Sequence, residues 1–157
     1  MPKIKFTKEQ QDRLVFFALK HLGKPYVYGA KSSTAPKNFD CSSFVQYLYK
    51  RIGVKLPRTT INQVDVGEPV KNIEKLEVGD LVFLHGTVGR YNHEFPQGIG
   101  HVAMYIGNGE VVHAAGSSRG DKVVREKLRS VIADYKLVAM RRYSHRLKQK
   151  VVHWSDR

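Results

Sequence analysis

The residues of this chain that could do chemistry are one cysteine and two histidines. Cys41 is the only cysteine in 157 residues, and it is followed by the segments Gly-His101-Val-Ala-Met and Val-Val-His113-Ala-Ala. A thiol can attack an acyl carbon, one imidazole can take and return its proton, and a second polar group can orient that imidazole. This set predicts acyl transfer with Cys41 as nucleophile, His101 as base and His113 as orienting group.

The segment around Cys41 is typical of a helix that begins at the cysteine. Apolar residues follow at positions 44, 45, 48 and 52, Gly53 is a stop signal, and Asp40 or Asn38 is a suitable N-cap. The unpaired N–H groups and the positive end of such a helix favour thiolate over thiol. The alternative is a structural Cys41, because a lone cysteine is more often a small buried apolar residue.

The two histidines are predicted on neighbouring antiparallel strands, over residues 102–106 and 110–114. Because side chains alternate along a strand, the connection between the strands decides whether the histidines share a face. A two-residue turn would pair Met104 with His113 and separate the imidazoles, whereas a three-residue loop would pair Ala103 with His113. We therefore predict an odd-numbered loop or a compensating bulge, with both imidazoles facing the cysteine's helix.

These segments resemble the NlpC-type cell-wall cysteine peptidases, a papain-like family that cuts the peptide stems of bacterial peptidoglycan. The resemblance extends over about residues 10–143, in the order of the family. The matching segments are Gly23-Lys-Pro-Tyr-Val-Tyr-Gly29, Phe39-Asp-Cys-Ser-Ser-Phe44, Leu56-Pro-Arg-Thr-Thr-Ile-Asn-Gln63, Gly79-Asp-Leu-Val-Phe83, Gly100-His-Val-Ala-Met-Tyr-Ile-Gly-Asn-Gly109 and Val112-His-Ala114.

The resemblance implies a Cys-His-His triad that acts through a thioester intermediate. It also implies a substrate, the amide bond between γ-linked D-glutamate and a diamino acid in a stem peptide. A related γ-glutamyl polymer such as polyglutamate is the alternative substrate. No metal or cofactor is expected, since His85 and His93 lack an adjacent cysteine or acidic cluster.

The resemblance also implies substrate-binding residues. Asp40, Ser42 and Tyr28 match positions that read the free amino end of the stem peptide. The Tyr28 hydroxyl matches a second oxyanion donor beside the backbone N–H of Cys41. Arg58 is a candidate partner for the free α-carboxylate of D-glutamate, with a structural role as the alternative.

The sequence departs from the family pattern in three places. It has Gly29-Ala30 where paired glycines are usual, and Ser43 where a glycine is usual. A side chain at position 43 is expected to narrow the cleft. The stretch 85–100 is longer than usual, and we interpret it as a rim or lid.

The net charge of +13, from 27 Lys and Arg against 14 Asp and Glu, fits a polyanionic partner. Anionic wall polymers are such a partner, whereas no nucleic-acid motif is present and nucleic acid is not expected. A basic binding module without catalysis is the third hypothesis, and it predicts salt-dependent binding that is insensitive to thiol alkylation.

The order of the predicted elements, helices first and antiparallel strands afterwards, indicates an α+β domain with N-terminal helices packed on the sheet. We expect one NlpC-type domain over residues 1–143 and a basic tail over 144–157. No membrane span is predicted, and residues 1–13 lack the apolar core of a signal peptide. The protein is therefore expected to stay in the cell or to leave by lysis, phage release or toxin secretion.

Overall fold

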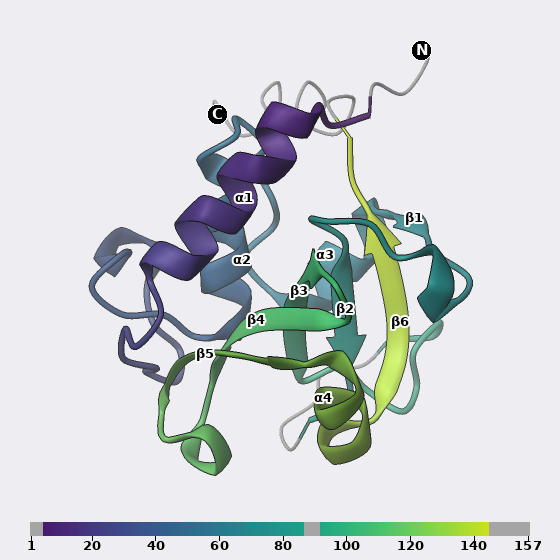
Figure 1. Cartoon of the computed structure of the whole chain (residues 1–157). Coiled ribbons are helices and arrows are strands. Elements are labelled where there is room, and N and C mark those ends of the chain that lie inside the picture. The colour runs from purple at the N-terminus through teal and green to yellow at the C-terminus, as the bar shows by residue number, and fades with distance from the viewer. Residues whose placement is uncertain (1–4, 87–91, 145–157) are drawn as a thin grey trace, which may run out of the picture.

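The structure, a computed structural model, describes residues 5–86 and 92–144. Within these residues the chain forms one six-stranded antiparallel sheet with the order β1-β6-β2-β3-β4-β5 (Figure 1). The strands are β1 (Glu68–Pro69), β2 (Leu81–Leu84), β3 (His101–Gly107), β4 (Glu110–Ala115), β5 (Lys122–Lys127) and β6 (Leu137–Arg142). The helices are α1 (Lys8–Lys20), α2 (Cys41–Lys50), α3 (Thr60–Val66) and α4 (Leu128–Tyr135), with 3-10 turns η1 (Ser32–Thr34), η2 (Ile73–Lys75) and η3 (Ser117–Arg119). The predicted α+β class is confirmed.

Helices α1 and α2 cover one face of the sheet and hold the larger part of the core. Thr7 and Gln10 form a capping box at the start of α1. Each fully buried large apolar side chain contributes about 1.5–3 kcal/mol. The buried residues that fix α2 against the sheet are Phe44, Val45, Leu48, Val102, Met104 and Val112.

Helix α4 packs on the other face of the sheet, with a smaller cluster of its own. Leu128 and Val131 of α4 join Ala103 of β3 and Val111 of β4 there. Alternation along the strands explains the division, since Val102 and Met104 point to α2 while Ala103 points to α4. Figure 1 shows α1 and α2 at the upper left of the sheet and α4 below it.

The β3–β4 hairpin uses a two-residue turn and a bulge. Asn108 and Gly109 have positive φ angles of 53° and 72°, as a type I′ turn requires. The register shifts between Tyr105 and Gly107, so that Met104 pairs with Val112 and not with His113. Of the two predicted alternatives, the odd-numbered loop is wrong and the compensating bulge is confirmed, so the histidines share a face.

That shared face is the one that α4 covers, which corrects the prediction that both imidazoles face α2. Tyr135 of α4 packs against both rings, with centroids 4.6 Å from His101 and 5.9 Å from His113. Odd-numbered residues of β3 point to this side, and α2 packs on the even-numbered ones. Cys41 therefore approaches the pair at the end of β3 and not across the face of the sheet.

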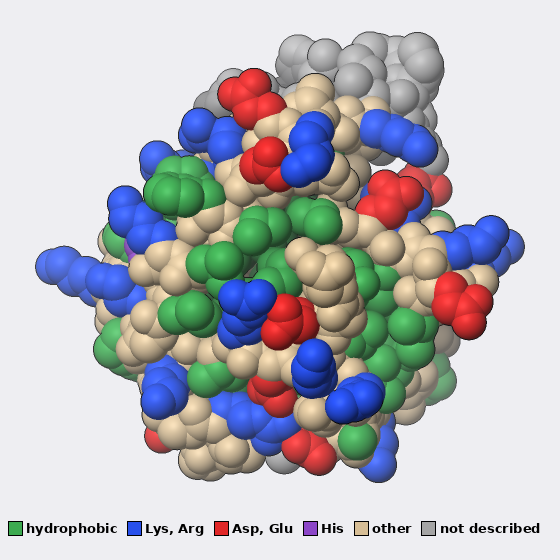
Figure 2. All heavy atoms as spheres, viewed as in Figure 1, with side chains coloured by type: hydrophobic (Ala, Val, Ile, Leu, Met, Phe, Trp, Pro, Cys, Tyr) green, Lys and Arg blue, Asp and Glu red, His purple; other side chains and the backbone are tan. Residues whose placement is uncertain are grey.

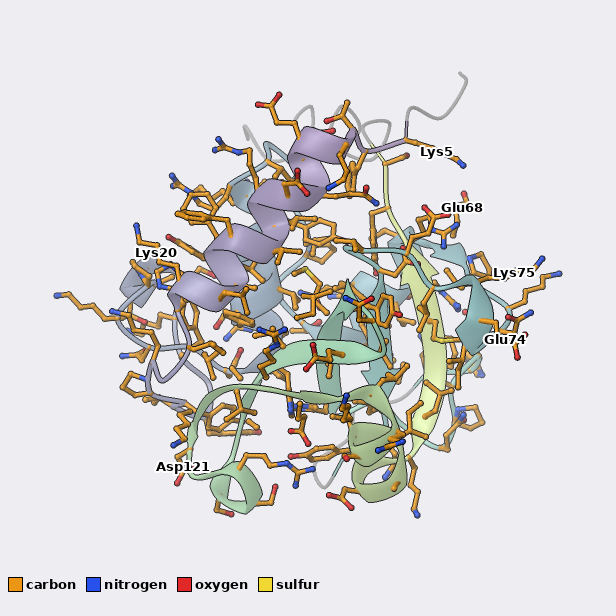
Figure 3. The ribbon with its side chains drawn as sticks, viewed as in Figure 1. Lys5, Lys20, Glu68, Glu74, Lys75 and Asp121 are labelled. Atoms are coloured by element: carbon orange, nitrogen blue, oxygen red, sulfur yellow. The ribbon has the colours of Figure 1, made fainter. Side chains whose placement is uncertain are left out.

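Lys and Arg side chains are spread over the surface among hydrophobic ones and do not gather in one patch on the face that Figure 2 shows. In Figure 3, Lys5, Lys20 and Lys75 lie at the periphery with side chains pointing away from the sheet. No helix within residues 5–86 and 92–144 is long and apolar enough to cross a membrane. The predicted tail lies outside the described residues after Ser144, as does the 87–91 part of the predicted rim.

Three further features differ from the sequence-based expectation. Helix α3 and strand β5 were not predicted, because neither has an apolar repeat that stands out. His21, which its basic neighbours mark as a surface residue, is buried as the C-cap of α1. Its ring packs edge-on against Phe39 and Tyr47, so aromatic packing outweighs the polarity of the local sequence.

Candidate active site

Cys41 is the first residue of α2, and the helix N-terminus around it is fixed by a buried capping box. The Oδ1 of Asp40 accepts a hydrogen bond from the Ser43 N–H at 2.8 Å, and the Ser43 hydroxyl accepts one from the Asp40 N–H at 2.9 Å. The Cys41 thiol donates to the carbonyl oxygen of Gly100 at 3.9 Å. The sulfur therefore lies next to the residue that precedes His101.

The protonation state of Cys41 differs from the expectation of a stabilised thiolate. Burial, reinforced by the Asp40 carboxylate, raises the pKa of Cys41 to about 12. The backbone N–H groups of Val102 and Ser42 and the charge of Arg58 lower this pKa, but by less. The helix terminus acts in the predicted direction, and desolvation of the sulfur outweighs it, so the resting group is a thiol.

Arg58 is held by the same helix N-terminus. Its Nη2 donates to Asp40 Oδ2 at 2.6 Å and to the carbonyl oxygen of Ala30, and its Nη1 donates to the Ser42 hydroxyl at 2.7 Å. These contacts join residues 30, 40, 42 and 58 into one polar cluster. The structure therefore brings three predicted site residues together, with Arg58 paired to Asp40.

A cavity of about 390 Å³ opens onto the thiol. Tyr28 lies on its rim and is 70% exposed, whereas Tyr26 is half-buried. Burial, followed by the Cys41 and Asp40 charges, raises the pKa of Tyr26 to about 12, so its hydroxyl stays protonated in the wall of the cavity. The residues that line the cavity are Tyr26, Tyr28, Gly29, Ala30, Lys31, Asp40, Cys41, Ser42, Arg58, Thr59, Thr60, Ile99 and Gly100.

Ser43 is absent from that lining, which corrects the expectation that it narrows the cleft. Its side chain is 2% exposed and is used in the capping box. It borders a different hollow, with Gln46 and Tyr47. The residue after Ser42 turns away from the thiol because successive helix positions point to different sides.

The two histidines are joined directly. His101 Nε2 lies 2.7 Å from His113 Nδ1, and the rings meet at an interplanar angle of 79°. Burial and the neighbouring His113 lower the pKa of His101 well below its usual value. With Nε2 occupied by His113, the Nδ1 of a neutral His101 is the nitrogen left to act as a base.

Residues of α3 hold the start of α2 and the neighbouring chain through hydrogen bonds to backbone carbonyl oxygens. Gln63 Nε2 donates to the carbonyl oxygens of Ser42 (3.1 Å) and Pro57 (2.8 Å), and Thr60 donates to that of Ile99 at 3.1 Å. Gln63 is fully buried. The motif Leu56-Pro-Arg-Thr-Thr-Ile-Asn-Gln63 thus supplies anchors that the sequence shows only as a matching segment.

Sequence reasoning missed Glu126, which lies behind the histidines. Its Oε2 lies 2.6 Å from His113 Nε2, and Arg119 donates to both of its oxygens. Glu126 lies on β5, which has no apolar repeat, so only the strand's pairing with β4 reveals the contact. Among the described residues no group of three His, Cys, Asp or Glu could hold a metal ion.

Comparison with known proteins identifies the family. The family model described as the NlpC/P60 family matches residues 23–142. Since the match covers more than half of the sequence, the chain belongs to the NlpC/P60 family. The resemblance seen in the motifs is thereby confirmed, together with the fold it implies.

Named relatives of the chain are hydrolases and peptidases. It is 34% identical over 129 residues to the gamma-DL-glutamyl hydrolase of Bacillus subtilis, covering 82% of this chain and 28% of that protein. It is 32% identical over 132 residues to the gamma-D-glutamyl-L-lysine dipeptidyl-peptidase of Bacillus cereus, covering 84% of this chain and 36% of that protein. The chain thus spans far less than half of either relative.

A solved structure shows the same fold. NlpC2 from Trichomonas vaginalis superposes with a TM-score of 0.72 at 27% identity, and the match covers 88% of this chain and 48% of that one.

Proposed function

We propose that this chain is a cysteine peptidase that hydrolyses γ-glutamyl amide bonds in peptidoglycan stem peptides. The observation that carries the proposal is the position of the Cys41 thiol, which lies at a helix N-terminus on an open cavity, one residue away from the linked pair His101 and His113. Membership of the NlpC/P60 family and the names of the two relatives support the same chemistry.

The reaction begins from a neutral thiol and a neutral imidazole. His101 Nδ1 takes the thiol proton as the sulfur of Cys41 attacks the amide carbonyl carbon, since the raised pKa of the thiol and the lowered pKa of the imidazole disfavour a stable ion pair. His101 then gives this proton to the leaving amine, the C–N bond breaks, and a thioester remains. Water adds to the thioester and releases the acid and the thiol.

Two donors are available for the oxyanion. The Cys41 backbone N–H is one, because the first N–H groups of a helix have no partner within it. The second is the hydroxyl of Tyr26, which lines the cavity with Cys41 and whose pKa responds to the Cys41 charge. Tyr26 takes the role that the sequence pattern assigned to Tyr28, which is left to contact substrate at the rim.

Binding of the stem peptide is assigned to the polar side of the cavity. Asp40 and Ser42 offer a carboxylate and a hydroxyl to a free amino end. Arg58 is engaged by both, so its charge serves first to hold Asp40. Lys31 is the other cation of the cavity, and it is exposed. We assign the α-carboxylate of D-glutamate to Lys31 and Arg58 together.

The experiment is digestion of purified peptidoglycan, with mass analysis of the released fragments and Cys41→Ala as the matched control. Fragments that end at γ-D-glutamate or begin with a diamino acid are expected from the wild type alone. Binding without any released fragment, weakened by salt and unchanged after thiol alkylation, would show a binding module and overturn the proposal.

A second substrate is favoured by one relative and by the charge. The Bacillus subtilis protein is named a gamma-DL-glutamyl hydrolase, and this chain carries a net charge of +13. Poly-γ-glutamate has a dense negative charge and the same kind of amide bond. Shortening of this polymer is measured beside the peptidoglycan digest. If the polymer is shortened and no peptidoglycan fragment is released, poly-γ-glutamate is the substrate.

A further inference from the structure

The carboxylate of Glu126 is the last member of a hydrogen-bonded row that begins at His101. His101 Nε2 lies 2.7 Å from His113 Nδ1, and His113 Nε2 lies 2.6 Å from Glu126 Oε2. His113 pairs with Val124 in the β4–β5 register, so Glu126 is its diagonal neighbour on the same face. The row is therefore built into the pairing of the two strands.

The charge of Glu126 decides which nitrogen of each imidazole carries the proton. Burial opposes ionisation, but hydrogen bonds from His113 and Arg119 outweigh it and lower the pKa of Glu126 to about 2. An ionised carboxylate only accepts, so His113 Nε2 donates, and in a neutral imidazole that donates through Nε2 the Nδ1 can only accept. His101 Nε2 is then the donor to His113, and the lone pair of His101 lies on Nδ1.

We propose that Glu126, held by Arg119, is a positioning residue that fixes both histidines as Nε2–H tautomers and keeps His101 Nδ1 free for the thiol of Cys41. This rests on the proposed function, because the free lone pair matters only if His101 takes the thiol proton. It goes beyond a triad, since without Glu126 the Nδ1 that His113 turns toward His101 could be either protonated or unprotonated.

Arg119 holds the carboxylate in one orientation. Its Nε lies 3.1 Å and 2.9 Å from the two Glu126 oxygens, and its Nη2 lies 2.9 Å from Oε1. The same Nη2 reaches Asp134 at 2.7 Å, which ties η3 to α4. A guanidinium only donates and keeps its proton, so Arg119 orients Glu126 without supplying a competing acceptor to the histidines.

Tyr135 restrains the ring that Glu126 orients. It stacks on His101 at 4.6 Å with an interplanar angle of 20°, and the Arg119 guanidinium lies 5.4 Å from its ring centroid. Rotation of the His101 ring out of its plane would break the stacking, and a half-turn flip would break the hydrogen bond to His113. Once His101 has taken a proton, Glu126 stabilises the imidazolium, because it is the group that raises the pKa of His101 against burial, His113 and Arg119.

The alternative role for Glu126 is purely structural, as a tether between strands. The chain offers a matched control, because Glu110 of β4 and Arg125 of β5 form an ion pair at 2.8 Å across the same two strands. Glu110→Gln removes a cross-strand carboxylate that pairs with arginine and not with a histidine. A structural role predicts similar behaviour of the Glu110→Gln and Glu126→Gln variants.

The first measurement needs no substrate. Ring ¹⁵N NMR spectra of the full chain at neutral pH, assigned with His101→Asn and His113→Asn, report the tautomer of each histidine. Both are expected as Nε2–H in the wild type and in Glu110→Gln. In Glu126→Gln the amide offers a donor as well as an acceptor, so His113 is expected to populate the Nδ1–H form.

The second measurement is the pH dependence of kcat and kcat/KM with a stem peptide as substrate. The other groups around His101 are the same in all variants, and they are Cys41 of α2, His113 of β4, Arg119 of η3, and Asp134 and Tyr135 of α4. In Glu126→Gln, kcat is expected to fall about tenfold to a hundredfold, as for other partners that orient a catalytic imidazole, with KM almost unchanged. The acid limb of kcat/KM should move to lower pH, because the carboxylate that raises the pKa of His101 is gone. Glu126→Asp should recover part of kcat.

The results separate this proposal from the proposed function. A wild type that cleaves no γ-glutamyl amide ends the proposed function, while the NMR spectra still decide the tautomers. An Nδ1–H form of His113 in the wild type, or unchanged tautomers and pH profile in Glu126→Gln, would overturn the positioning role. If Glu126→Gln unfolds, Arg119→Lys tests the same point, because it keeps the charge and loses the forked contact.

Discussion

Two buried histidines of this chain have opposite surroundings. His113 is fully buried, and both of its ring nitrogens have partners, His101 on one side and Glu126 on the other. His21 is 5% exposed, and within the described residues neither of its ring nitrogens has a partner. The charges nearest to His21 are those of Lys24, Lys20 and Arg51, all positive.

The difference separates a histidine that orients a second imidazole in the proposed mechanism from one that only fills space. Burial disfavours the imidazolium at His21 and at His101, but only the sheet supplies a carboxylate, that of Glu126, which can stabilise a proton when one arrives. At His21 a proton would meet three cations and no acceptor. Substitutions around His113 should therefore alter turnover, and substitutions at His21 should alter stability.

The largest effect is expected at Cys41, whose thiol proton is taken by His101 in the proposed mechanism. Cys41→Ala should reduce the turnover of stem peptides to background, because Cys41 is the only cysteine of the chain and its thiol is the nucleophile of the proposed mechanism. The free energy of unfolding should change by less than about 1.5 kcal/mol, since the side chain is small. Peptide release followed by mass spectrometry, with urea unfolding of the same sample, checks both. Full activity of the variant would remove Cys41 from the mechanism.

The next effect distinguishes the two histidines of the partnered region. His101→Ala should lower kcat about 10³-fold, because this residue moves the proton. His113→Gln should cost only about tenfold, since an amide oxygen can accept from His101 while its NH₂ donates to Glu126. His113→Ala should cost more than His113→Gln, because the alanine leaves both partners unpaired. Steady-state kinetics on one peptide decide the order, and equal losses for the two substitutions at 113 would contradict an orienting role.

The thiol itself gives a smaller and directly measurable effect. Burial and Asp40 raise the pKa of Cys41 to about 12, so alkylation by iodoacetamide should be slow at neutral pH. Its rate should rise steadily as the pH increases toward 12, because the thiolate is the reactive form. The rate of mass increase from pH 6 to 10 measures this. A fast rate that levels off near neutral pH would indicate a preformed thiolate and imidazolium.

The part of the site that could be predicted from the sequence depends on local rules. The N-cap at Asp40, the helix after it and the strand around His101 follow from capping and periodicity. The requirement that His101 and His113 share a face predicted an odd-numbered loop or a compensating bulge, because an unbulged two-residue turn would have separated them, and the structure has the bulge. Local rules also predicted the direction in which a helix terminus acts on Cys41, but not the larger cost of burying the sulfur.

The part that could not be predicted depends on contacts between distant segments. Glu126 lies on an edge strand with charged residues at its exposed positions, as edge strands often have, and only the β4–β5 register brings it to His113. His21 follows a lysine at the end of a helix, which is the sequence of a surface site. Its burial results from Phe39 and Tyr47, and no pattern near position 21 reports them.

The smallest effect is expected at His21, whose ring nitrogens have no hydrogen-bond partner within the described residues. His21→Phe should stabilise the fold by about 1 kcal/mol at neutral pH, because it removes two buried unpaired nitrogens and keeps an aromatic ring against Phe39 and Tyr47. Burial, together with Lys24, Lys20 and Arg51, lowers the pKa of His21 below 6.5 in the folded chain. The unfolded chain therefore binds more protons as the pH falls below 6.5, and the wild type loses stability in that window.

His21→Phe lacks this loss, so its advantage should grow between pH 7.5 and pH 5, while turnover at neutral pH stays unchanged. The lowered pKa of His101 contributes a similar acid loss to both proteins and cancels in the difference. Urea unfolding followed by far-ultraviolet circular dichroism at the two pH values gives the comparison. A constant difference would mean that His21 titrates alike in the folded and unfolded chain, and the contrast with His113 would then rest on hydrogen bonding alone.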